Sequence, residues 1–433
     1  MFSNYRKIFE KKHFLLILFS LLIFYLYHFF NYNISKQHDV WLHHYYIFNI
    51  LKFNFSEINS EYGIFYYLYT AGFSIFTYPF YYFQVLDDRE VFYLTIRFSN
   101  LSLLFLTFFL IYQISKKIFF FNDYQITLTI LLCFSFGFFN KTFFMARPEN
   151  LMIPLSLIII LETYKIIEYN KINFKIILPS LCILSAQKVS GLIFCLLILI
   201  FLFLKKKNYY YYKLLLLFIF GLILLYILHY LIFDVKFYEN SDRLFGDTNS
   251  LGLINNLDKI YIIFKFSLID AWRNPIRDFQ NYSIINILSL EIIGDYWKYG
   301  IFNYTKFNIN ENCLINLNRI SIFFFIIFIT LIISLFINSF YMVTNPSSSK
   351  YSISYLIFFL QLAGIGIIVL AVFFRANLID LDIVKYEYIS FFLLPIIFNL
   401  VEFSKSNSVY KVVIYILIGM GLYNNLLPIH CIF

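Results

Sequence analysis

Long apolar runs constrain this chain more than any other feature of its sequence. Runs of about 15 to 25 residues, each able to form a helix that crosses the hydrocarbon core of a bilayer, recur through most of the chain. Of its 433 residues, 61% are hydrophobic and only 14% are charged, and the mean hydropathy is +0.73. This composition lies outside the range of soluble globular domains. The sequence therefore predicts an all-α integral membrane protein.

We expect about eleven transmembrane helices in a single polytopic domain over residues 1–433. The first apolar run is too long for the core of a secretory signal and lacks a small-residue cleavage site, so it predicts a retained helix. The predicted spans are residues 13–30, 92–114, 124–140, 150–168, 174–187, 190–204, 213–233, 320–341, 353–374, 386–402 and 411–428.

The positions of lysine and arginine predict which connections face the cytoplasm. Four basic residues within the first twelve precede the first span and place the N-terminus in the cytoplasm. Every later connection that then falls on the cytoplasmic side is basic. These connections carry Lys116 and Lys117, Lys165 to Lys175, Lys205 to Lys207 with Lys213, Lys350, and Lys405 with Lys411.

One further apolar run, Tyr62–Phe83, is not counted as a span, because a full crossing would move Lys116 and Lys117 to the outside. Its tyrosines are typical of the membrane interface, and Pro79 interrupts the run. We expect one or two interfacial helices here, within a first extracytoplasmic loop over residues 31–91. A second long outer loop, residues 234–319, is expected to be partly structured and to rest on the membrane.

Charged residues that the cytoplasmic bias does not explain fall on the predicted outer face. They are Asp39, Glu57 and Glu61 in the first outer loop, Arg97 in the next span, Arg147 and Glu149 in FFMARPENL, Lys188 in AQKVSG, Asp295 in GDYWKYG, and Arg375, Asp382 and Lys385 in the last outer loop. A site that holds a phosphate leaving group needs cations against it and a carboxylate that takes a proton from the acceptor. This set contains both.

Each of these residues also has a purely structural explanation. Arg147 would extend to the headgroups from a helix end, Glu149 would stabilise a helix N-terminus, and Lys188 would be solvated at a hairpin tip. His38, His43 and His44 lack a spacing such as HExxH, so they predict no metal site, although a divalent ion stays open. No Walker pattern, glycine-rich nucleotide loop or GxSxG elbow occurs, which leaves a lipid-borne donor.

Two other features of the composition exclude function classes. The net charge of +9 comes largely from lysines at the ends of predicted helices, so we do not expect nucleic acid as a partner. The five cysteines are scattered and show no CxxC spacing, so they predict neither a disulfide framework nor a metal site.

The order of these features resembles the GT-C superfamily of membrane glycosyltransferases, in particular the group of protein O-mannosyltransferases and bacterial aminoarabinose transferases (glycosyltransferase family 39-like). The first similar features are Asp39 after the first helix and EYGIFYYLYTA, which stands where the group has a Pro-Pro-Leu-Tyr-Tyr stretch. Arg97 in TIRFSNLSLL, Glu149 in ARPENLMIPLSL and Lys188 in AQKVSG follow. The last similar segment is KYEYISFFLLP, with Lys385, Tyr388 and Pro395. This sequence departs from the group at Val40, where a second acidic residue is common, and at Tyr62 and Gly63, which replace the two prolines.

The resemblance implies an inverting transferase that moves a sugar from a polyprenyl-phosphate donor to a glycan, lipid or protein on the extracytoplasmic face, without a cofactor. Asp39 would be the general base. Arg97, Arg147, Glu149, Lys188, Lys385 and Tyr388 would bind the donor phosphate, and His43, His44, Glu61 and Asp295 would lie on the acceptor side. We expect surrounding membrane lipids as partners, and the bacterial cell membrane rather than the endoplasmic reticulum as location.

Two other functions stay open at this point. A flippase for lipid-linked oligosaccharides would need charges lining a cavity at mid-membrane depth and internal repeats, and the sequence shows neither. A polysaccharide polymerase or ligase would place its essential arginines in the late outer loop, as Arg243, Arg273 and Arg277 could be, and would not need Asp39.

Overall fold

A computed structural model of the chain describes residues 19–27, 40–55, 63–83, 87–205, 209–233, 265–276, 283–294, 311–344, 358, 361–367 and 390–425. Within these ranges the chain is mostly helical and forms no strand. The prediction of an all-α fold is therefore confirmed for the described part of the chain.

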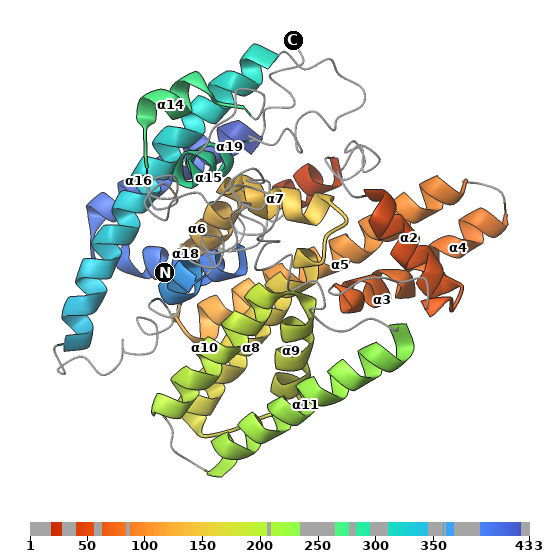
Figure 1. The fold of residues 1–433 in the computed structure, drawn as a ribbon. Helices are drawn as coiled ribbons and strands as arrows, with labels where there is room; N and C mark the ends of the chain where they lie inside the picture. Colours follow the sequence, from red (N-terminus) through yellow and green to blue (C-terminus); the bar gives the residue numbers. More distant parts are fainter. Residues whose placement is uncertain are drawn as a thin grey trace, which may run out of the picture.

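The helices are shown in Figure 1, and residues 19–27 and 361–367 are helical as well. The labelled helices are α2 Val40–Leu51, α3 Ile64–Gly72, α4 Ser74–Tyr82, α5 Asp88–Lys117, α6 Asp123–Ser135, α7 Gly137–Phe144, α8 Glu149–Tyr169, α9 Phe174–Gln187, α10 Val189–Lys205, α11 Tyr209–Phe233, α14 Leu268–Arg273, α15 Ile284–Glu291, α16 Glu311–Thr344, α18 Ser390–Phe403 and α19 Ser408–Asn425.

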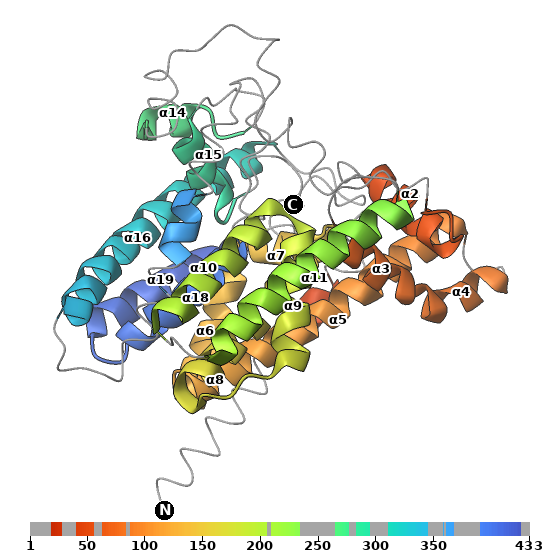
Figure 2. The same ribbon diagram turned by 60° about the horizontal axis from the view of Figure 1, so that its bottom comes forward.

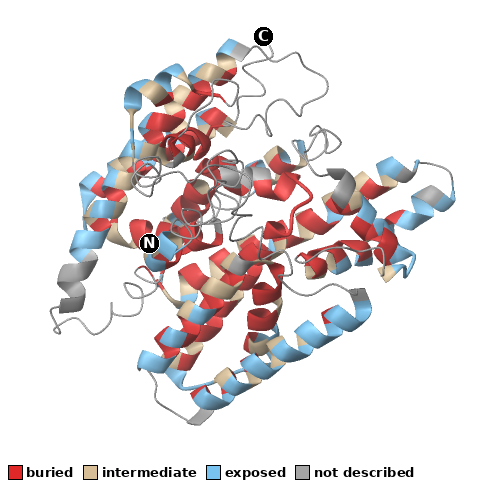
Figure 3. Cartoon of the chain, in the orientation of Figure 1, coloured by how far each residue is buried: buried red, intermediate tan, exposed pale blue. Residues whose placement is uncertain are grey.

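In the part of the chain that the structure describes, four helices are long and apolar enough to cross a membrane. They are α5, α8, α11 and α16, and they contain the predicted spans 92–114, 150–168, 213–233 and 320–341. A helix of about 20 residues is needed for the hydrocarbon core. Figure 3 shows that the outer face of α11 is exposed along most of its length, and most of its exposed side chains are apolar.

The prediction of about eleven spans is not supported, because several predicted spans form shorter helices. The run 124–140 breaks at Phe136, whose backbone is extended, and the next residue, Gly137, donates its N–H to the Ile292 carbonyl at 3.1 Å. The helices α9 and α18 have 14 residues each, which gives a length of about 21 Å against a core of about 30 Å. The predicted spans 13–30 and 353–374 lie largely outside the described residues.

The apolar run 62–83 forms two helices of nine residues, α3 and α4, each about 14 Å long. The break lies at Phe73, whereas Pro79, the predicted interruption, lies inside α4. Polar side chains of both helices form hydrogen bonds with polar side chains of α5. Thr77 and Thr95 have their hydroxyl oxygens 2.6 Å apart, and the hydroxyls of Tyr69 and Ser102 are 2.5 Å apart.

Helices α8, α9 and α10 fold back and forth, and α8 starts beside the middle of α5, where Asn150 Nδ2 donates to Asn100 Oδ1 at 2.9 Å (Figures 1 and 2). Beyond this contact, α5 continues to Lys117 and α8 continues to Tyr169. Helix α9 then runs back, so that the residue after it, Lys188, lies beside Glu149 at the start of α8. We call these two ends of the bundle the Lys117 end and the Lys188 end. The Lys405 Nζ donates to the Phe119 carbonyl at 3.0 Å, so the connection before α19 also lies at the Lys117 end.

The late helices pack on the same bundle. Asn338 Nδ2 on α16 donates to the Tyr410 hydroxyl at 3.5 Å, which places the C-terminal part of α16 near the start of α19 and the Lys117 end. The start of α16 lies opposite, where Asn318 Nδ2 donates to the Pro275 carbonyl at 2.8 Å. Through this contact, α14 and α15 from the loop 234–319 rest on the first turns of α16 (Figure 2).

Two glycines of α19 test this packing, because they differ only in what surrounds them. A Cβ at Gly421 would lie 2.4 Å from the Ser135 carbonyl oxygen of α6, whereas a Cβ at Gly419 would meet nothing within 4 Å. We expect Gly421→Ala to lower the free energy of unfolding by about 1 to 3 kcal/mol through overpacking. Gly419→Ala should be neutral or stabilising by up to about 1 kcal/mol, because alanine favours the helix.

The measurement is the melting temperature of both purified variants in one detergent. Equal melting temperatures for the two variants would contradict the close approach of α19 to α6.

Candidate functional site

A network of polar side chains fixes the connection that leads into α8. The carbonyl of Met145 accepts from Asn100 Nδ2 and from Asn150 Nδ2, each at 2.8 Å. The hydroxyl of Tyr66 donates to Asn100 Oδ1 at 3.0 Å. Burial raises the pKa of Tyr66 well above its usual value, so this hydroxyl keeps its proton and remains the donor. All three side chains are buried. Residues 145–150 are thus held by α3, α5 and α8.

A close backbone approach places α3 against the same connection. Gly63 precedes α3 with a φ of +84°, which is a left-handed conformation that favours glycine. A Cβ at this position would lie 2.6 Å from Pro148 Cγ. The stretch EYGIFYYLYTA and the stretch ARPENL, which the sequence analysis singled out separately, are therefore in contact.

The break between α9 and α10 brings a lysine to the start of α8. Lys188 has an extended backbone between the two helices, and its ammonium contacts Glu149 Oε1. Glu149 is 1% exposed and the Lys188 side chain is 17% exposed. The tight turn requires Gly191, because a Cβ there would lie 2.2 Å from the Leu184 carbonyl oxygen. This glycine is the fourth residue of the segment KVSG.

Arg147 adds a second cation to the Lys188 end. Its side chain is 7% exposed, and it interacts electrostatically with Glu149. Two positive charges and one negative charge therefore lie together, with the N-terminus of α8 at Glu149 and that of α10 next to Lys188. A helix N-terminus carries a partial positive charge. The site has a net positive charge, and such a site favours an anion.

Arg97 lies on α5, three residues before Asn100 in the sequence. It is partly buried, and its guanidinium interacts with the ring hydroxyl of Tyr93. The structure therefore places Arg97 less than one helical turn from the polar network of Asn100.

The histidines of α2 pack against aromatic side chains. His43 is buried, and its Nδ1 is 2.9 Å from the Tyr67 hydroxyl. The ring centroid of His44 lies 4.4 Å from that of Phe92. In the described part of the chain, no group of three or more histidine, cysteine, aspartate and glutamate side chains could hold a metal ion.

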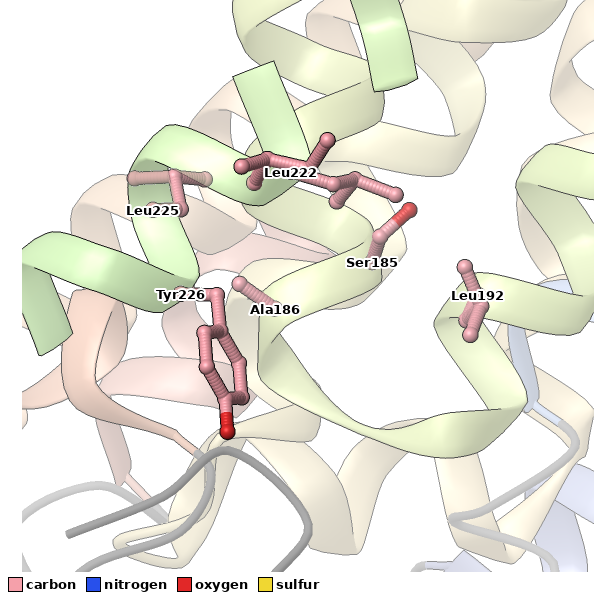
Figure 4. A pocket seen from close by; sticks show the side chains of 7 residues that line it. Ser185, Ala186, Leu192, Leu222, Leu225 and Tyr226 are labelled. Carbon is pink, nitrogen blue, oxygen red and sulfur yellow. The ribbon is translucent and has the colours of Figure 1, made fainter. Parts of the chain in front are cut away.

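A mostly apolar pocket lies next to the turn that carries Lys188 (Figure 4). Its volume is about 300 Å³, and it lies between α9, α10 and α11. Ser185 and Tyr226 contribute the polar groups, and the other lining residues are Ala186, Leu192, Leu222, Ile223 and Leu225. Because Ser185 and Ala186 come three and two residues before Lys188, the pocket adjoins the charged site along α9.

The structure therefore brings together three of the predicted site residues, Arg147, Glu149 and Lys188. Five others, Asp39, Glu61, Asp295, Lys385 and Tyr388, lie outside the described residues. Four neutral residues, Tyr66, Asn100, Asn150 and Gln187, were not among the predicted site residues. Their signal was present, because a polar side chain inside an apolar run is costly in a membrane and marks a buried contact.

Comparison of the chain with models of protein families, with curated proteins and with solved structures gave no match. The interpretation of the site therefore depends on its geometry and chemistry.

The ion pair between Lys188 and Glu149 can be tested by a double-mutant cycle. Loss of one partner leaves a buried charge, so Lys188→Met and Glu149→Gln should each lower the free energy of unfolding by about 3 kcal/mol. The double variant should recover much of this loss. The matched control is the more exposed pair of Lys116 and Asp123, whose atoms lie 2.8 Å apart and whose side chains are 36% and 31% exposed.

In the control cycle the coupling should stay below about 1 kcal/mol. The measurement is unfolding by SDS in mixed micelles. Similar coupling in both cycles would mean that the Lys188 pair is solvated rather than buried.

Proposed function

We propose that this chain is a GT-C-like membrane glycosyltransferase that moves a sugar from a polyprenyl-phosphate donor to an extracytoplasmic glycan, lipid or protein. The observation that carries the proposal is the contact of Lys188 with Glu149 beside Arg147, at the meeting point of two helix N-termini. Two cations held by one carboxylate leave a net charge of about +1 for a phosphate.

The distribution of basic residues supports an outer location for this site. Lys116, Lys165 and Lys405 lie at the Lys117 end, and the hydrogen bond from Lys405 to the Phe119 carbonyl joins two of the connections predicted to be cytoplasmic. The 21 residues of α8 place Glu149 about 30 Å from Tyr169, which is the thickness of the hydrocarbon core. The site would then lie near the outer membrane surface, where the phosphate of a lipid donor lies.

A disulfide-bonded cysteine on α16 supports the same orientation, with the Lys117 end toward the cytoplasm. Cys313 forms a disulfide, contrary to the expectation from the sequence, and it lies near the start of α16, at the end opposite the Lys117 end. Disulfides persist in oxidising compartments outside the cytoplasm. In contrast, Cys133, Cys182 and Cys195 are free and buried.

The apolar pocket of Figure 4 supports a lipid-borne donor. It adjoins Lys188 through Ser185 and Ala186, and α11, which forms one of its walls, presents apolar side chains to its surroundings. A polyprenyl chain could reach this pocket from the bilayer while its phosphate meets Arg147 and Lys188.

In the proposed reaction Asp39, which lies outside the described residues, removes the proton from an acceptor hydroxyl or amine. The acceptor atom attacks the anomeric carbon with inversion, and the bond from that carbon to the phosphate oxygen breaks. Polyprenyl phosphate leaves with the electron pair, and Arg147 and Lys188 stabilise its added negative charge.

Substitutions at two positions separate donor binding from proton transfer. Arg147→Ala should weaken use of the donor about 10- to 100-fold, and Arg147→Lys should recover only part of it, because a lysine cannot form the bidentate contact of a guanidinium. Asp39→Asn should lower transfer at least about 100-fold while donor binding stays near that of the wild type. The measurement is transfer of a radiolabelled sugar in proteoliposomes.

The control is Arg273→Ala, because Arg273 is exposed on α14. Full transfer by the Asp39 and Arg147 variants, together with loss of transfer in Arg273→Ala, would replace this proposal with a polymerase or ligase.

A further inference from the structure

Gln187 has a fully buried amide without a hydrogen-bond partner. It is the last residue of α9, directly before Lys188, and it is 0% exposed. Among the residues that the structure describes, neither Oε1 nor Nε2 of Gln187 has a partner. Burying an amide without hydrogen bonds is unfavourable, so a side chain of this kind indicates a ligand or bound water.

Two neighbours of Lys188 also have free hydrogen-bonding capacity. Ser190, in the first turn of α10, has a buried hydroxyl that has no partner in the described part of the chain, and the same holds for Glu149 Oε2. The opposite oxygen of Glu149 contacts Lys188. Gln187 and Ser190, which flank Lys188 closely in the sequence, and Glu149, which contacts its ammonium, therefore offer a ligand donors and acceptors that have no partner among the described residues.

The mixture of donors and acceptors indicates the chemistry of the ligand. A phosphate only accepts hydrogen bonds, so it would satisfy Gln187 Nε2 and Ser190 but leave Gln187 Oε1 and Glu149 Oε2 without donors. A hydroxyl group donates and accepts, and adjacent hydroxyls match both atoms of an amide. The phosphate itself is matched by the cations Arg147 and Lys188.

We propose that Gln187, with Ser190 and Glu149 Oε2, binds the hydroxyl groups of a headgroup whose phosphate lies against Arg147 and Lys188. The ligand class is a lipid phosphate that carries a polyhydroxyl group, and under the proposed function this group is the transferred sugar. Gln187 then determines specificity for the sugar, and it makes no contribution to binding of the lipid phosphate alone.

Two sources supply this headgroup chemistry, a polyprenyl-phosphate sugar and a membrane phospholipid such as phosphatidylglycerol. The experiment uses full-length protein in phosphatidylcholine nanodiscs. The probes are polyprenyl phosphate, its glucose, galactose, mannose and N-acetylglucosamine derivatives, and phosphatidylglycerol. Affinity is measured for the wild type, Gln187→Leu and Gln113→Leu. Gln113 is the matched control, because it lies on α5 four residues before Lys117.

The wild type should bind at least one sugar derivative about tenfold more tightly than polyprenyl phosphate, as expected for a site built to bond a hydroxyl. Gln187→Leu should remove this preference and keep the affinity for polyprenyl phosphate within about twofold. Without ligand, Gln187→Leu should melt at the same temperature as the wild type or higher, because the leucine has no polar atom to satisfy. Gln113→Leu should change neither affinity.

Three results would overturn the inference: a lower melting temperature of Gln187→Leu, equal loss of affinity for all probes, or no preference for any headgroup in the wild type. A Gln187-dependent preference for phosphatidylglycerol, with no binding of polyprenyl lipids, would uphold the headgroup site and overturn the glycosyltransferase proposal.

Discussion

The contact between Lys188 and Glu149 is the interaction on which the arrangement of this chain depends. Glu149 is buried and Lys188 is largely shielded from water, and a buried charge is costly unless an opposite charge meets it. The break between α9 and α10 therefore has to lie beside the start of α8. That position in turn carries Arg147 and Pro148, and Pro148 contacts Gly63 at the start of α3. The ion pair and the contact of Pro148 with Gly63 thus join three segments that are distant in the sequence.

The two ends of the bundle differ in the burial of their charged and polar side chains. At the Lys117 end, charged side chains form exposed or short-range pairs, such as Lys116 with Asp123. At the Lys188 end, Arg147, Glu149 and the amide of Gln187 are buried near a mostly apolar pocket, and the polar atoms of that amide have no partner among the described residues. A site for a phosphate with a lipid on one side and a polyhydroxyl group on the other accounts for the cations, the pocket and the amide together.

The sequence predicted those elements for which composition along the chain is sufficient. The helices α5, α8, α11 and α16 follow from apolar runs, and the grouping of Arg147, Glu149 and Lys188 follows from charges that topology does not explain. The breaks at Phe136 and Phe73 were not predicted, because they depend on contacts such as that of Gly137 with Ile292. The amides of Asn100 and Gln187 were not predicted either: a polar residue inside an apolar run indicates a buried contact, but only the packing shows what surrounds that residue. The functional roles of all these residues stay predictions.

The most direct test is mass spectrometry of lipid-linked sugars and surface glycans in cells that lack this chain. The account predicts that one polyprenyl-phosphate monosaccharide accumulates and that the same sugar disappears from a surface glycan, lipid or protein. Expression of the wild-type chain should reverse both changes, and expression of Arg147→Ala should reverse neither fully. Unchanged lipid-linked sugars and unchanged surface glycans would contradict the account.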